Sequence, residues 1–127
     1  MKAFLLVTFV SVNALASVPV YRAVSYLNWK DSKGKEQRSS LHVEDKTVRV
    51  DALEIPKANW KKGQAAIKSL TSPQVTATKK ACANGSSYTL RVAKGNKKSI
   101  TEQGCTDSPR FKELEKNFSA LKDLLPK

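Results

Sequence analysis

The sequence predicts a small α+β domain, in which an antiparallel sheet, arranged as a meander, is packed by a C-terminal amphipathic helix and a short central helix, with one disulfide. Several segments rich in β-branched and aromatic residues are separated by polar or glycine turns, which is typical of strands. Two other segments repeat apolar residues at helical spacing. The chain has no internal repeat or low-complexity tract, so a single domain over residues 17–127 is expected.

The first half of the chain is predicted to be mostly strand. Three strands are expected, over residues 18–29, 39–44 and 46–55. In the third strand Val48, Val50 and Ala52 would share one face, opposite Arg49 and Asp51. Pro56 should end this strand, because proline has no N–H to give to a sheet.

A short central helix is predicted from Asn59 to Leu70. Asn59 would be its N-cap. Trp60, Ile67 and Leu70 fall on one helical face. Gly63 inside the helix would cost about 1 kcal/mol relative to alanine.

A second group of strands is expected after Pro73. Residues 74–83 and 86–94 flank Asn84-Gly85, a strong hairpin signal. This hairpin would place Ala81 opposite Tyr88. A third strand over 97–103 would follow, with Ile100 opposite either Arg91 or Val92, depending on the length of the turn.

The clearest helix is the C-terminal one. Ser108 is a good N-cap and Pro109 suits the first helical position. A single apolar stripe follows, formed by Phe111, Leu114, Phe118, Leu121 and Leu125. We expect this stripe to pack on the sheet face that carries Tyr88, Leu90 and Val92, rather than on a membrane or a partner helix. Pro126 should end the helix.

Residues 1–16 have the three regions of a secretory signal peptide: a basic start, an apolar stretch and a small-residue ending at Ala16. The apolar stretch is shorter than the roughly 20 residues that span a bilayer. We therefore expect a secreted or periplasmic protein that has no transmembrane segment after cleavage.

The chain has two cysteines, Cys82 and Cys105, and an exported protein favours a disulfide between them. A metal site or a redox pair would be expected to show other spacings. Such a bridge would contribute about 3 kcal/mol in the chain-entropy model. The predicted hairpin register places Cys82 two strands away from the end of the strand over residues 97–103. Cys105 should therefore leave the sheet and turn back toward Cys82, with Gly104 allowing the bend.

Positive charge is concentrated in one block. The net charge of the whole chain is +12, and residues 55–101 hold ten basic residues and no acid. Such a block attracts anionic partners. The predicted binding surface consists of Lys79, Lys80, Arg91, Lys94, Lys97 and Lys98. Lysine-rich surfaces also serve solubility and protect sheet edges, so this surface could lack any binding role.

No catalytic or cofactor motif is found in the sequence. His42, the single histidine, falls between Leu41 and Val43 in a strand pattern and would point away from their face. Nothing in the sequence completes a triad or a metal-ligand set around it. We therefore expect a protein that is not an enzyme and that needs no cofactor or metal.

The C-terminal half resembles small bacterial secreted protease inhibitors of the emfourin type. The resemblance rests on the run from Tyr88 to Val92 and on Leu114, Leu121 and Leu125. It implies an inhibitor role but no inhibitory residues. Together with the charge, it favours a binding or inhibitor module for an acidic protein partner. The alternative is a general binder of anionic polymers such as lipopolysaccharide or nucleic acid.

Overall fold

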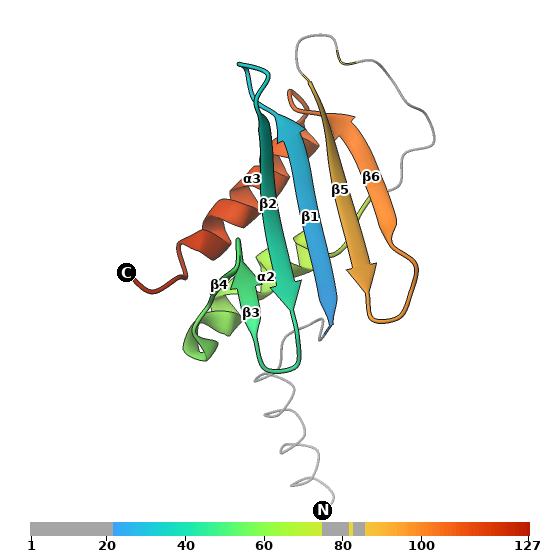
Figure 1. The fold of residues 1–127 in the computed structure, drawn as a ribbon. Helices are drawn as coiled ribbons and strands as arrows, with labels where there is room; N and C mark the ends of the chain where they lie inside the picture. The colour runs from blue at the N-terminus through green and yellow to red at the C-terminus, as the bar shows by residue number, and fades with distance from the viewer. Residues whose placement is uncertain (1–21, 75–81, 83–85) are drawn as a thin grey trace, which may run out of the picture.

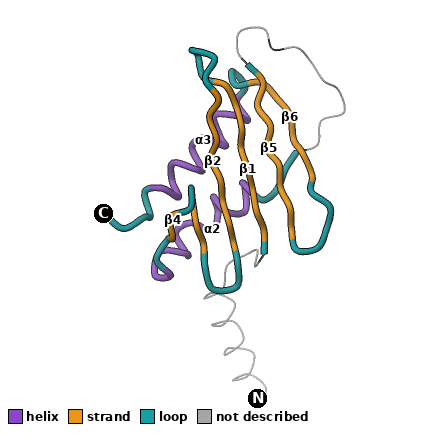
Figure 2. The backbone as a smooth tube through the Cα atoms, viewed as in Figure 1, coloured by secondary structure: helices purple, strands orange, loops and turns teal. Residues whose placement is uncertain are grey.

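The computed structural model describes residues 22–74, 82 and 86–127. Their strands are β1 (Ala23–Lys30), β2 (Glu36–Val43), β3 (Val48–Val50), β4 (Leu53–Glu54), β5 (Ser87–Lys94) and β6 (Ile100–Cys105). Their helices are the 3₁₀ turn η1 (Lys57–Asn59), α2 (Trp60–Leu70) and α3 (Pro109–Lys122). The strands form one antiparallel sheet in the order β4-β3-β2-β1-β5-β6. Both α-helices lie on the same face of that sheet, which confirms the predicted α+β class (Figures 1 and 2).

The first hairpin has its predicted polar turn. The carboxylate of Asp31 accepts hydrogen bonds from the backbone N–H groups of Lys33 and Lys35, each at 2.9 Å. Gly34 has a φ of +79°, a conformation that glycine adopts without steric cost. The turn therefore directs β2 back along β1.

The prediction of one continuous strand over residues 46–55 is wrong, because the chain turns at Asp51 and Ala52. These residues have φ values of +50° and +69° and form a tight turn between β3 and β4. Positive φ at both central residues matches the right-handed twist of a two-residue hairpin. Asp51 holds this turn, since its carboxylate accepts the N–H of Ser40 at 2.9 Å. Ala52 is therefore an exposed turn residue and does not share the buried face of Val48 and Val50.

Replacing Ala52 by glycine should stabilise the protein. An L-residue other than glycine pays about 1–2 kcal/mol in the left-handed region, partly offset by the greater freedom of glycine in the unfolded chain. We expect Ala52→Gly to raise the free energy of unfolding by roughly 0.5–1 kcal/mol, measured by urea denaturation. Ala65→Gly, at an exposed position inside α2, is the matched control and should lower it by about 1 kcal/mol. Equal losses in both variants would contradict the strain at Ala52.

The predicted hairpin around Asn84-Gly85 is also corrected. Strand β5 pairs with β1 on one side and with β6 on the other, so neither edge is left for a strand over 74–83. Tyr88 lies opposite Trp29 and Gly104, not opposite Ala81. Residues 75–81 and 83–85 lie outside the described residues.

Of the two registers predicted for β6, the structure has the one that follows from a three-residue turn. Ile100 lies opposite Val92, and Arg91 lies opposite Thr101. Ile100 is nevertheless 47% exposed, because it begins the strand at the sheet edge. The β5–β6 hairpin turns at Gly95, which has a φ of +53°.

Helix α2 buries its predicted apolar face, with Trp60, Ile67 and Leu70 in the core. Asn59 takes the N-cap position, but its side chain donates to the carbonyl of Leu124 at 3.0 Å instead of capping the helix. Gly63 lets the two helices approach closely, since a Cβ there would lie 2.9 Å from Leu121.

Helix α3 begins as the sequence predicts. The hydroxyl oxygen of Ser108 accepts the N–H of Phe111 at 3.2 Å, and Pro109 is the first helical residue. The apolar stripe is buried against the sheet, and the ring centroids of Phe111 and Tyr88 are 5.3 Å apart. The helix ends at Lys122, earlier than Pro126 predicts, so Leu125 packs on the core from the C-terminal turn.

The predicted disulfide between Cys82 and Cys105 is present, with Cα atoms 5.5 Å apart. The prediction that Cys105 leaves the sheet to reach Cys82 is wrong. Cys105 stays in the sheet as the last residue of β6, opposite Ser87, and Cys82 lies outside any strand. Gly104 serves a different purpose, because a Cβ there would lie 2.6 Å from the ring of Tyr88.

Among the described residues, no helix is long and apolar enough to cross a membrane. The core lies between the helices and one face of the sheet. The other face carries no helix of the described chain (Figure 1). We call it the open face.

Candidate binding surface

The structure divides the predicted basic surface. Arg91 lies on the open face, in line with Ala93. Lys94 belongs by strand alternation to the opposite side of β5. Lys97 and Lys98 are exposed in the β5–β6 turn, at one end of the sheet. Lys79 and Lys80 lie outside the described residues.

The open face gathers side chains that the sequence scatters. Strand alternation and register place on it Val24, Tyr26, Asn28, Arg38, Ser40, His42, Arg49, Thr89, Arg91, Ala93, Thr101 and Gln103. Three of the chain's five arginines are in this set. The open face is therefore rich in arginine, although the chain as a whole is rich in lysine.

Tyr26, on the central strand β1, lies in the middle of this set. Its ring meets His42 edge-on, with centroids 5.7 Å apart, and its hydroxyl lies 3.3 Å from Nε2 of that histidine. The guanidinium carbon of Arg38 lies 5.2 Å from the centroid of the same ring. His42 points away from the face of Leu41 and Val43, as predicted, and contacts an aromatic ring.

A shallow hollow of about 250 Å³ lies beside Tyr26. Its lining residues are Val24, Tyr26, Asn28, Arg38, Arg91 and Ala93. No carboxylate lines it. The acids of the open face lie at its margins: Glu36 begins β2, and Glu54 lies opposite Arg49 on the edge strand β4. The centre of the open face is therefore positive.

The sequence prediction included Arg91 but missed Arg38 and Arg49, because residues 38, 49 and 91 are far apart in the chain. The signal that could have identified them is the alternation of side chains between the two faces of each strand. Each lies between two residues that face the helices, so each must face the other way. What the sequence does not give is the pairing of β5 with β1, which brings Arg91 opposite Tyr26.

A second cluster of charged residues is buried and structural. Glu102 is 1% exposed, and both its oxygens lie 2.9 Å from donors of Arg110. Tyr88 donates its hydroxyl to Glu102 at 2.5 Å, and the backbone N–H of Gln74 donates at 2.7 Å. This cluster joins β5, β6, α3 and the segment after α2, and Arg110 also donates to Glu113 and to the carbonyl of Ser72, each at 3.3 Å.

The ionisation of this cluster follows from its contacts. Burial opposes ionisation of Glu102, but the hydrogen bonds from Arg110, Gln74 and Tyr88 outweigh it and lower the pKa of this carboxyl. For Tyr88, burial and the neighbouring carboxylate raise the pKa of the phenol above its ordinary value. Glu102 therefore stays charged and Tyr88 neutral at physiological pH.

The lowered pKa predicts how stability depends on pH. A carboxyl whose folded-state pKa lies below its unfolded value of 4.5 stabilises the fold fully above that unfolded value. This stabilisation is lost as the pH falls through the folded-state pKa. We expect the free energy of unfolding to drop between about pH 5 and pH 3, measured by urea denaturation. Glu102→Gln should flatten this slope, and equal slopes in both proteins would contradict the prediction.

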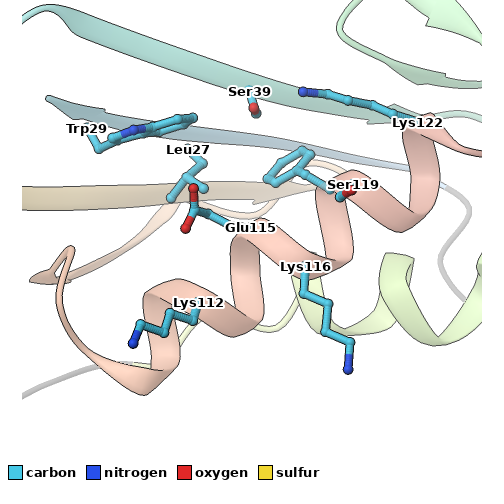
Figure 3. A pocket seen from close by; sticks show the side chains of 9 residues that line it. Leu27, Trp29, Ser39, Lys112, Glu115, Lys116, Ser119 and Lys122 are labelled. Carbon is cyan, nitrogen blue, oxygen red and sulfur yellow. The ribbon is translucent and has the colours of Figure 1, made fainter. Parts of the chain in front are cut away.

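A larger groove of about 490 Å³ runs beside α3, over Leu27, Trp29 and Phe118. Figure 3 shows Glu115 reaching from α3 toward Leu27, whereas Lys112 and Lys116 project away from the sheet. Lys122 at its far end pairs with Asp51 at 3.1 Å. The floor residues Leu27 and Phe118 are 0% and 3% exposed, so the groove offers little apolar surface. Its charges are mixed, and it is a weaker candidate than the open face.

The described residues contain no group of three His, Cys, Asp or Glu side chains that could hold a metal ion. Comparisons with known proteins give no further guidance: no protein-family model matches the chain, and no curated protein or solved structure is detectably similar to it. The resemblance to emfourin-type inhibitors stays a prediction.

Proposed function

We propose that this protein is an exported, non-catalytic binding protein that holds an acidic protein partner on the open face of its sheet. The observation that carries the proposal is the set of arginines around Tyr26, with no carboxylate at its centre. Helices cover the other face of the sheet, and the open face offers half-buried and exposed side chains over β1, β2 and β5.

Arginine supports a protein partner more than a general polyanion surface. Arginine is more weakly hydrated than lysine and is enriched in protein interfaces, together with tyrosine. A general polyanion surface needs only positive charge, which the exposed lysines of α2, α3 and the β5–β6 turn already provide. An inhibitor of an acidic protease is one form that such a binding protein could take, and it follows from the resemblance of the C-terminal half.

The proposal is tested by affinity capture from the native envelope and culture fluid. The wild-type protein is the bait, with washes at low salt and then at about 0.5 M salt, where exposed charges are largely screened. We expect one acidic protein to remain after the high-salt wash. A mixed set of acidic material that washes off would support the general polyanion surface instead. A captured peptidase would then be assayed for inhibition.

Two charge-reversed baits locate the surface. Arg38→Glu with Arg91→Glu reverses two charges on the open face, and Lys112→Glu with Lys116→Glu reverses two exposed charges on α3. Both change the net charge by the same amount. Only the first should lose the partner. Reversal of Lys97 and Lys98 shows separately whether the β5–β6 turn belongs to the surface.

A further inference from the structure

Arg38 is held in place by uncharged groups. Its Nε donates to Oδ1 of Asn28 at 2.7 Å, and its guanidinium lies over the ring of Tyr26. Tyr26 is in turn oriented by His42. In the described chain Arg38 makes no ion pair. The N–H groups of its two terminal nitrogens are therefore available to donate to an acceptor on another molecule.

Arg91 is held in the same way on the other side of Tyr26. Its Nε donates to Oγ of Ser99 at 3.2 Å, and the described residues give it no carboxylate partner. Arg91 lies directly opposite Tyr26 on β5, whereas Arg38 is on β2. The two strands flank β1, and Arg38 lies opposite Asn28, two residues along β1 from Tyr26, so the two arginine backbones are about 12 Å apart. Both side chains line the same hollow.

The size and lining of the hollow limit what it can hold. At about 250 Å³ it is smaller than the ~300–1,000 Å³ of sites for drug-sized molecules. Val24, Tyr26 and Ala93 give it half-buried apolar walls. Such a hollow fits one side chain of a partner better than a separate ligand.

We infer that Arg38 and Arg91 form a specific site for one carboxylate group of the partner, an aspartate or glutamate side chain or a C-terminus. A guanidinium binds a carboxylate through two parallel hydrogen bonds, which a lysine cannot reproduce. Arginines already fixed by Asn28 and Ser99 lose less conformational freedom on binding. This inference rests on the proposed function and names the chemical group that the open face recognises.

The test uses a hexaglutamate peptide as the probe, with binding measured by calorimetry and by NMR shifts of the arginine Nε–H signals. The variants are Arg38→Lys with Arg91→Lys, which keeps the charge, and Arg38→Glu with Arg91→Glu. Lys112→Glu with Lys116→Glu is the matched control, and circular dichroism verifies that every variant folds. We expect the wild-type protein to bind, the lysine variant to lose roughly tenfold in affinity, and the control to bind as the wild type does.

Each other outcome overturns a distinct claim. If the lysine variant binds as well as the wild type and the glutamate variant does not, the open face binds by charge alone. The carboxylate site is then wrong and the proposed function stands. If neither variant loses affinity, binding occurs elsewhere and both claims fail. If the wild-type protein does not bind the peptide, the carboxylate site is wrong, and the capture experiment decides the proposed function independently. Tighter binding of a triphosphoserine peptide, whose charge of about −6 is close to that of hexaglutamate, would assign the hollow to phosphate instead.

Discussion

Glu102→Gln is expected to lower the free energy of unfolding by about 3–5 kcal/mol, because in the described chain it leaves the mostly buried Arg110 with only the exposed Glu113, at 3.3 Å, as a charged partner. Glutamine keeps the size of the side chain but cannot accept two charge-assisted hydrogen bonds from Arg110 while also accepting from Tyr88 and Gln74. Urea denaturation of the two proteins at pH 7 measures the loss.

A second variant separates the lost pair from a general failure to fold. Combining Glu102→Gln with Arg110→Met removes both charges and should recover part of the stability, because no buried charge is then left unpaired. Recovery in the double variant would show that the damage comes from the unpaired charge. A double variant as unstable as the sum of the single variants would contradict the coupling between Glu102 and Arg110.

Loss of the disulfide is expected to have a comparable effect. Replacing Cys82 and Cys105 by serine should lower the free energy of unfolding by about 3 kcal/mol, because the bridge closes a loop of about 24 residues in the unfolded chain. The bridge is also the described contact that anchors Cys82, which is in no strand, to the end of β6.

The reduced wild-type protein supplies the control. It should unfold at the same urea concentration as the serine variant, and the reducing agent should not affect that variant. If reduced wild type and the serine variant match the oxidised protein, the bridge contributes nothing to stability. If the variant alone is unstable, the serine side chains themselves are the cause.

The sequence predicted the helices better than the sheet. Periodicity and end signals at Ser108, Pro109 and Asn59 are local, and α2 and α3 formed where they indicated. The disulfide was predicted from the cysteine count and the export signal. The position of Cys105 within β6 was not predicted, because it depends on which strands lie beside β5.

The errors in the sheet have two physical causes. The strong Asn84-Gly85 signal favoured a local hairpin, but β5 pairs with β1, about 65 residues away in the chain, and no local pattern encodes such a pairing. Asp51 and Ala52 turn the chain without glycine, because Ser40 and Lys122 contact the aspartate from other elements. The same long-range pairing of β5 with β1 brings the arginines of the candidate site together, so the sequence did not predict that they are neighbours.

The central position of β1 constrains how the chain folds. Its two neighbours are β2, made directly after it, and β5, which begins at Ser87. Closing so long a loop costs chain entropy before its contacts are gained, so the β1–β5 pairing belongs to the slow part of folding. Until β5 has been synthesised, β1 has an unpaired edge, and the tyrosine and arginines of the open face are not yet together. A nascent chain that ends before Ser87 therefore has neither a closed core nor a binding surface.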